Sequence, residues 1–341
     1  MAPYRNAVTA WNRMECEGCL FDLTATLTSG QAFRWRRDAS GIWWGSVGST
    51  GMALWQRHGD SSAPLYWQTF PESGLRAIVE DYFRLDVPLV NLYTSWSAAE
   101  PHMIEAIQAF RGLRILRQPP IECFFAFQCA TCNTVVKIER TVHRLATRYG
   151  ERVGPGSGPD GERTPPTGLN DTPPALTSPS SPTFPIHLFP ELDALAEADE
   201  ADLRADLWGY RAPRVIALAR HLQARGPGWL EGLRAVSYAD AKTELTALHG
   251  IGEKVADCIC LFSLDKDEAV PVDTHVRQIA CRLFLPELDG KSLTPRIYAA
   301  IADAYRERFG VYAGWAQQYL FLGAMRGFHG TKNESMKRPA P

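Results

Sequence analysis

The spacing of apolar residues changes character once along this chain, at Pro119–Pro120. Before that point, short aromatic runs are separated by Gly, Asp and Ser, a pattern typical of antiparallel strands. After it, apolar residues recur with helical spacing. A single change of this kind predicts an α+β chain, with an N-terminal antiparallel sheet domain that also carries helices, followed by a mainly α-helical domain. We expect these domains to span residues 1–118 and 119–327.

Four segments refine this outline. Residues 20–27 alternate apolar and polar side chains, which predicts a strand, and residues 121–149 form one long stretch with helical periodicity. Residues 153–182 are dense in Pro, Gly, Ser and Thr and nearly free of large apolar side chains, so we expect a disordered insertion. The polar tail at 328–341 is expected to be flexible.

Composition and charge argue against a membrane-spanning protein but do not exclude a nucleic-acid-binding one. No apolar run approaches the roughly 20 residues of a membrane span, and the polar N-terminus has no signal core. We therefore expect a cytoplasmic protein, or a nuclear one if the source is eukaryotic. The net charge of −2 speaks mildly against nucleic acid, but residues 137–152 and 211–225 are locally basic. Two solvated helix faces would explain these segments equally well.

Eight cysteines include two CxxC pairs, Cys16–Cys19 and Cys129–Cys132. Two such pairs can bind zinc, but about 110 residues separate them and several of the cysteines lie in apolar sequence. We expect reduced, mostly buried thiols. No set of side chains predicts a metal site, and no cofactor is expected.

A glycine-containing turn at residues 248–254, LHGIGEK, lies between two helical patterns. Gly250 and Gly252 permit a tight turn, and the helix that follows begins with free N–H groups. Together they predict a cradle for an anion, with a DNA phosphate as the natural candidate. An ordinary turn between two helices would also explain these residues.

Lys254 falls in the first turn of an otherwise apolar helix, and Asp273 follows nineteen residues later. Pro271 disfavours helix, and Asp273 is well placed to cap a helix over 274–284. By itself, a lysine at this position is most often a solvated surface residue.

This stretch resembles the helix-hairpin-helix DNA glycosylases that carry a Gly/Pro-rich loop ending in Asp, and most of all the 8-oxoguanine DNA glycosylases of the eukaryotic type. Six blocks carry the resemblance, in the family's order, between about residue 15 and residue 327. They are TSGQAFRW at 28–35, ECFFAF at 122–127, GYRA at 209–212, KVADCIC at 254–260, AVPVDTH at 269–275 and YAGWAQ at 312–317.

The resemblance implies a bifunctional glycosylase/lyase that acts as a monomer on double-stranded DNA containing oxidised guanine, away from membranes. Lys254 matches the family's nucleophilic lysine and Asp273 its aspartate. A neutral amine can attack C1′ and form a Schiff base that permits β-elimination, and a carboxylate stabilises the positive charge that develops on the sugar. The damaged base must leave the helical stack to reach such a site.

The resemblance also assigns contacts to the DNA. The carbonyl of Gly30 matches the acceptor for N7–H of 8-oxoguanine, Phe321 the ring that stacks on the base, Gln317 the reader of its Watson–Crick edge, and Cys258 the residue on the opposite face. Without it, Phe321 and Cys258 would be interpreted as core and Gly30 as a turn residue. The residues expected to contact the rest of the DNA are Cys132, Asn133, Lys137, Tyr210, Arg211, His249, Gly250, Gly252 and His275.

Two positions depart from the family pattern. Cys132 stands where the family commonly has Asn, and Lys137 where it has Arg. A thiol is a weak donor, and a lysine replaces a planar fork with a point charge. Asn133 is one residue away and could compensate. We predict weaker discrimination for cytosine opposite the lesion than is usual in the family.

Two other functions stay open at this point. The chain could be a non-catalytic module that uses the hairpin to hold phosphate, or a glycosylase for a different oxidised or alkylated base. The iron–sulfur glycosylases are excluded, because they need four clustered cysteines after the hairpin and this chain has only Cys281 beyond Cys260. Lys254 argues against the alkylation type, which generally lacks it.

Overall fold

The computed structural model describes residues 11–16, 18–70, 75–130, 133–153, 184–226 and 228–327. The predicted insertion, apart from Val153, lies outside the described residues, as do the tail from 328 and the candidate DNA contact Cys132. Val153 itself lies in a short strand, where it pairs with Ile186.

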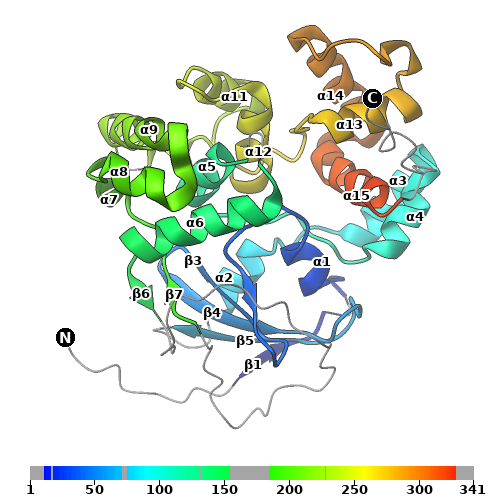
Figure 1. The fold of residues 1–341 in the computed structure, drawn as a ribbon. Coiled ribbons are helices and arrows are strands. Elements are labelled where there is room, and N and C mark those ends of the chain that lie inside the picture. The colour runs from blue at the N-terminus through cyan, green and yellow to red at the C-terminus, as the bar shows by residue number, and fades with distance from the viewer. Residues whose placement is uncertain are drawn as a thin grey trace, which may run out of the picture.

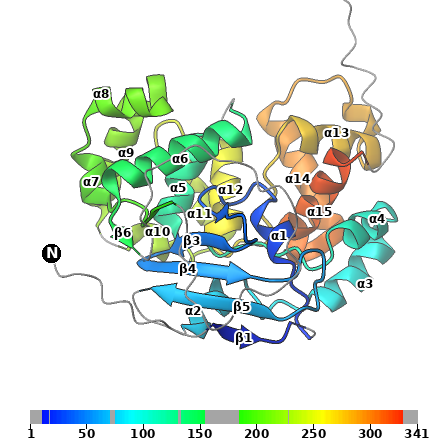
Figure 2. The ribbon, with the colours of Figure 1, turned by 60° about the horizontal axis from the view of Figure 1, so that its bottom comes forward.

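An antiparallel sheet forms the lower layer of the molecule in the view of Figure 1, and Figure 2 shows it from another side. Its strand order is β1-β5-β4-β3-β2. Along β4, Met52 and Leu54 contribute to one buried cluster, whereas Ala53 and Trp55 contribute to a second. Alternation therefore buries both faces of the sheet, which explains the aromatic runs in the sequence. The strands are β1 (Asn12–Met14), β2 (Arg36–Arg37), β3 (Trp43–Val47), β4 (Thr50–Trp55) and β5 (Leu65–Phe70), with a separate pair β6 (Arg152–Val153) and β7 (Ile186–His187).

The strand predicted at residues 20–27 is wrong, because α1 (Leu23–Leu27) is a helix. The side chain of Asp22 accepts a hydrogen bond from the N–H of Ala25 at 2.8 Å, which is an N-cap. The side chain of Gln56, far away in the sequence, accepts the N–H of Leu23 at 2.8 Å. A local cap and a long-range bond therefore outweigh the alternating pattern.

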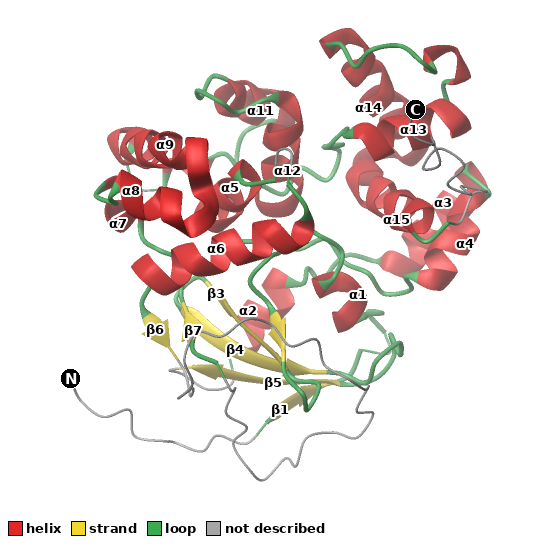
Figure 3. Ribbon diagram, viewed as in Figure 1, coloured by secondary structure: helices red, strands yellow, loops and turns green. Residues whose placement is uncertain are grey.

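Helices make up most of the remaining described chain, as Figure 3 shows in red. The helical stretch predicted over 121–149 is two helices, and the side chain of Thr134 caps the second. The helices are α2 (Arg76–Tyr82), α3 (Leu89–Ala99), α4 (His102–Ala109), α5 (Pro120–Gln128), α6 (Val135–Tyr149), α7 (Leu192–Ala196), α8 (Glu200–Leu203), α9 (Ala212–Arg225), α10 (Trp229–Gly232), α11 (Tyr238–Thr246), α12 (Glu253–Ser263), α13 (Thr274–Leu283), α14 (Pro295–Phe309) and α15 (Ala313–Met325).

One large apolar cluster joins the helices from α3 to α15, whereas the buried residues of α2 belong to a cluster with the sheet. Helices α3 and α4 pack against α14 and α15, where Trp96 and Tyr319 lie with ring centroids 5.5 Å apart. The sheet is joined to α5 by a buried ion pair, in which Arg34 donates two hydrogen bonds to Glu122 at 2.8 and 2.7 Å. The boundary at residue 118 remains a prediction.

The cysteines that the structure describes are free, and Cys19 alone among them is not fully buried. This agrees with the expectation of reduced, mostly buried thiols. No helix in the described part of the chain combines the length and apolar character that crossing a bilayer requires.

Candidate active site

The predicted hairpin is present between α11 and α12. Gly250 has φ +83°, and a Cβ there would lie 2.6 Å from the guanidinium of Arg214. The positive φ favours glycine at this position, and an added Cβ would also require the Arg214 side chain to move. Gly252 differs, because its φ is −89° and nothing lies within 4 Å of an added Cβ. The turn leads directly into α12, whose first N–H groups have no partner within the helix, so the hairpin can receive an anion.

Lys254 is the second residue of α12 and is half-buried. Its ammonium lies 5.6 Å from the centroid of the Phe127 ring, on α5. One turn further along α12, burial raises the pKa of the Cys258 thiol to about 11, while the neighbouring Lys254 opposes that shift through its charge and a hydrogen bond. The lysine is therefore held between an aromatic face and a neutral thiol.

Asp273 caps α13, as its position in the sequence predicts. Its carboxylate accepts the N–H of Val276 at 2.8 Å, and its backbone is extended. One oxygen is held by the helix in this way. The side chain is half-buried, so the carboxyl group also borders the cleft that contains Lys254.

A cleft of about 840 Å³ brings the two predicted catalytic residues together with part of the predicted DNA-binding set. Its walls come from the end of α5, the segment before α9, the hairpin, and the loop that ends at Asp273. These elements are far apart in the sequence, so the tertiary fold creates the site. The predicted residues that line it are Lys254, Asp273, Asn133, Tyr210, Arg211, Gly250, Gly252 and His275.

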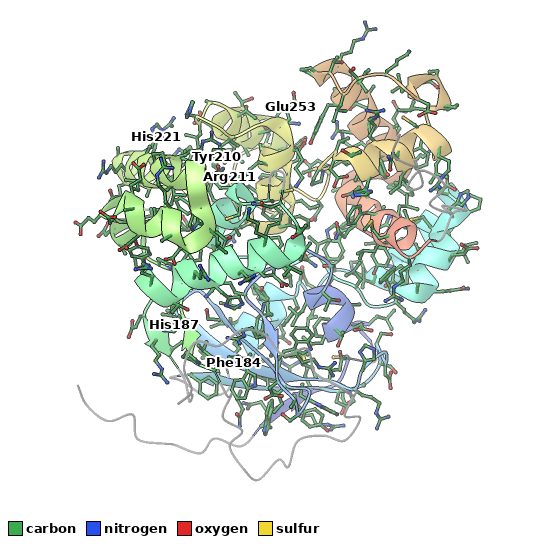
Figure 4. The ribbon with its side chains drawn as sticks, viewed as in Figure 1. Phe184, His187, Tyr210, Arg211, His221 and Glu253 are labelled. Atoms are coloured by element: carbon green, nitrogen blue, oxygen red, sulfur yellow. The ribbon has the colours of Figure 1, made fainter. Side chains whose placement is uncertain are left out.

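Tyr210 and Arg211 lie on an irregular turn formed by η1 (Arg204–Trp208) and η2 (Gly209–Arg211). Leu207 has φ +73°, a strained conformation for a leucine. The Tyr210 ring is 67% exposed, and the guanidinium of the buried Arg211 lies 4.5 Å from its centroid. Figure 4 shows both in the helical part with Glu253, away from Phe184 and His187 beside the sheet. An exposed aromatic ring at this turn is suited to wedge between bases.

The predicted base-binding residues are not part of the lining of this cleft. Gly30 has φ +81°, and Gln318 donates to the carbonyl of its neighbour Ser29 at 2.9 Å, which joins that turn to α15. On the same helix, the Phe321 ring lies 6.1 Å from the ring of His275, which does line the cleft. Cys258 is buried in α12.

Gln317 is 3% exposed, and its side-chain oxygen Oε1 has no hydrogen-bond partner among the described residues. A buried amide oxygen without a partner is costly. A ligand donor that enters the site would remove that cost, as the predicted base-reading role requires.

Three predicted DNA contacts either lie outside the lining of the cleft or already make a hydrogen bond within the protein. Lys137 on α6 and His249 in the hairpin are exposed and do not line the cleft. Asn133 lines it, but its Nδ2 already donates to the carbonyl of Cys129 at 2.7 Å. This bond uses one of the two N–H groups with which Asn133 could compensate for Cys132.

Sequence reasoning missed Gln128, the last residue of α5. Its side chain lines the cleft, is 5% exposed, and has an Nε2 without a partner among the described residues. The signal available in the sequence was a single amide at the end of an otherwise apolar run. Gln128 thus adds a second unpaired amide group, this time a donor, to the site.

A buried polar network under the cleft was also missed. The carboxylate of Asp257, fully buried in α12, accepts hydrogen bonds from Tyr238 at 2.6 Å, Tyr298 at 2.5 Å and Lys242 at 3.0 Å. The Tyr298 hydroxyl oxygen also accepts the N–H of Val272 at 3.1 Å. Burial raises the pKa of Asp257, and the charge of Lys242 and these bonds oppose that shift. The network therefore fixes the residue that directly precedes Asp273.

Comparison with known proteins shows to which class of protein this chain belongs. Residues 13–124 match the model of the 8-oxoguanine DNA glycosylase N-terminal domain, and residues 133–301 that of the HhH-GPD superfamily base excision DNA repair proteins. These matches define a helix-hairpin-helix base-excision protein. The relatives below are named as enzymes, which does not favour a non-catalytic DNA-binding module.

The chain is 33% identical to the N-glycosylase/DNA lyase OGG1 of Arabidopsis thaliana over 94% of its own length and 82% of the relative's. It is 28% identical to the N-glycosylase/DNA lyase of Saccharomyces cerevisiae over 91% and 85%. The chain therefore belongs to the 8-oxoguanine DNA glycosylase family of N-glycosylase/DNA lyases.

Solved structures support the fold. The Clostridium acetobutylicum 8-oxoguanine glycosylase/lyase, in complex with double-stranded DNA containing cytosine opposite 8-oxoguanine, superposes with a TM-score of 0.71 at 24% identity, covering 90% of this chain and 92% of that one. The Archaeoglobus fulgidus 3-methyladenine DNA glycosylase gives 0.67 at 18% identity, covering 92% and 98%. Because both share the architecture, the fold alone does not select the base.

Proposed function

We propose that this protein excises 8-oxoguanine from double-stranded DNA and then cleaves the strand by β-elimination through a Schiff base on Lys254. The observation that carries the proposal is the cleft in which Lys254 and Asp273 meet the exposed ring of Tyr210 and the guanidinium of Arg211. A nucleophile, a carboxylate and a wedge for opening the duplex border one space.

The residues divide the chemistry as follows. The neutral amine of Lys254 attacks C1′ as the bond to the base breaks, and the base leaves with a proton. Asp273 stabilises the positive charge on the sugar during this step. The sugar ring then opens to give a Schiff base to Nζ, loss of a C2′ proton follows, and the 3′ phosphate is eliminated. The hairpin holds a DNA phosphate at the first N–H groups of α12.

Recognition of the base rests on the turn at Gly30 and on α15. The Gly30 carbonyl accepts N7–H, which 8-oxoguanine has and guanine lacks. Gln317 uses its unpaired Oε1 as the acceptor for the Watson–Crick edge. The Phe321 ring and the Cys258 side chain cover the two faces of the flipped base.

Recognition of the opposite base is weaker in this proposal than is usual in the family. Arg211 contacts the orphaned base after Tyr210 enters the gap, but Lys137 is exposed and the Nδ2 of Asn133 already donates one of its two hydrogen bonds to the backbone. Gln128, with its free Nε2, supplies an amide donor from another position of the same cleft. An amide donor bonds to carbonyl oxygens of cytosine and thymine alike, so it discriminates little.

The protein is further proposed to act as a monomer in the compartment that holds the DNA, which is the nucleoid or the nucleus. No metal or cofactor takes part in the proposed steps. Among the described residues, no group of three or more His, Cys, Asp or Glu side chains is arranged to hold a metal ion.

The decisive experiment measures excision on duplexes that carry 8-oxoguanine opposite each of the four bases, with borohydride added to trap the Schiff base. We expect a covalent complex with the wild type and none with Lys254→Gln. Comparable excision opposite all four bases would support the weak opposite-base reading, whereas a strong cytosine preference would refute it. Trapping by folded Lys254→Gln would show that another residue is the nucleophile.

A further inference from the structure

The Cys16–Cys19 pair has no role in the glycosylase chemistry proposed above. It lies between β1 and α1, in a turn closed by the hydrogen bond from the N–H of Cys19 to the carbonyl of Cys16 at 3.2 Å. The N–H of Leu20 donates to the same carbonyl at 2.9 Å, and the Cys19 thiol also donates to it at 3.6 Å. A turn of this kind keeps its first and fourth Cα atoms within about 7 Å, a range that overlaps the one a disulfide spans.

The two thiols differ in exposure and in acidity. Cys16 is fully buried, whereas Cys19 is partly exposed. A hydrogen bond from the Cys16 thiol lowers the pKa of Cys19 to about 7, burial opposes this shift, and the charge of Arg114 assists it. The same contact raises the pKa of Cys16. Cys19 is thus the more acidic of the two thiols and is within reach of solvent, and Cys16 is the less acidic, buried thiol beside it.

The other described cysteines lack this chemistry. Each is buried, and burial is the largest cause that raises the pKa of each thiol. Because the thiolate is the reactive form, an oxidant that reaches the described cysteines reacts first at Cys19. These other residues are Cys123, Cys129, Cys258, Cys260 and Cys281.

We propose that Cys16 and Cys19 are a redox modification site that forms a reversible intramolecular disulfide on the sheet domain. The oxidant is a hydroperoxide such as hydrogen peroxide, and the reductant is a cellular thiol or dithiol. The Cys19 thiolate attacks the peroxide and becomes a sulfenic acid, and hydroxide leaves. The Cys16 thiol then displaces the sulfenic oxygen as water, and the S–S bond forms. Reduction by two thiol equivalents restores both residues.

Hydrogen bonds through Arg114 connect the Cys16–Cys19 turn to the turn that carries Gly30. Arg114, which is fully buried, donates to the carbonyls of Cys19 and Leu20. The carbonyl of Arg114 in turn accepts a hydrogen bond from Gln31 at 2.8 Å. Oxidation therefore takes place at one end of a buried chain of hydrogen bonds whose other end is next to the proposed base-reading glycine.

The test treats reduced full-length protein with hydrogen peroxide, blocks remaining thiols with N-ethylmaleimide, and measures intact mass and disulfide-linked peptides. We expect the loss of two hydrogen masses, a link between Cys16 and Cys19, and reversal by dithiothreitol. In Cys16→Ser, a sulfenic acid at Cys19 should persist and react with dimedone. Cys281→Ser is the matched control and should keep the link.

A second readout does not depend on a variant that folds. The rate of Cys19 alkylation by iodoacetamide in the wild type should reach half its maximum near pH 7, because the pKa of Cys19 is about 7. The proposal fails if peroxide links other cysteines, if no mass is lost, or if Cys19 titrates like an ordinary thiol above pH 8.

Discussion

Removing the Tyr298 hydroxyl tests the buried network that supports the loop ending at Asp273. In Tyr298→Phe, the Asp257 carboxylate loses a donor that lies 2.5 Å away, and the N–H of Val272 loses its acceptor at 3.1 Å. A hydrogen bond to a charged group contributes about 1.5–3 kcal/mol, and an unpaired buried N–H costs about 1–3 kcal/mol. Tyr238 and Lys242 still hold Asp257, so we expect the free energy of unfolding to fall by about 2–4 kcal/mol.

The measurement is equilibrium unfolding in urea, followed by circular dichroism and tryptophan fluorescence. Tyr305→Phe is the matched control, because Tyr305 is also fully buried but its hydroxyl has no partner among the described residues. Loss of that hydroxyl should leave stability unchanged or slightly higher. The reasoning is refuted if both variants unfold within about 0.5 kcal/mol of the wild type, the range of an ordinary neutral substitution.

The remaining predictions concern the cleft. Lys254→Gln should abolish borohydride trapping while leaving the unfolding midpoint within a few degrees of the wild type, because the side chain is only half-buried and its ammonium lies near the Phe127 ring. A trapped covalent complex would contradict this prediction. Gly250→Ala should destabilise the protein by about 1–3 kcal/mol, because its φ is positive, and should weaken binding of undamaged duplex, whereas Gly252→Ala should be tolerated. Equal effects of the two substitutions on DNA binding, measured by fluorescence anisotropy, would argue against the phosphate cradle. Gln317→Ala should reduce kcat/KM for 8-oxoguanine about 10-fold, a loss of about 1.4 kcal/mol. Unchanged kinetics would exclude Gln317 from base reading.

The sequence by itself determined the features that depend on near neighbours along the chain. Helical periodicity gave the helices that flank the hairpin, and Asp273 caps α13 where its sequence predicts. The positive φ of Gly250 follows from the same local pattern. Capping, turn formation and amphipathic spacing act over a few residues, so they can be inferred before any packing is known.

Tertiary structure decided whatever depends on distant residues. Its long-range bond between Leu23 and Gln56 supports the helix α1, which the local cap from Asp22 also favours, against the alternating pattern. Tertiary structure also left Gln128 with an unpaired amide in the cleft. Whether a buried polar group finds a hydrogen-bond partner depends on residues that are distant along the chain and come near it only in the folded protein.

The same division applies to the catalytic pair. Lys254 and Asp273 were identified from the sequence, the first from its place after the hairpin and the second from its place after Pro271, together with the family resemblance. Their meeting with Tyr210 in one cleft required the packing of α9, α12 and α13 around a common core. Local residue patterns and the family resemblance thus predicted the proposed reacting groups, while long-range burial of apolar faces brought those groups into one cleft.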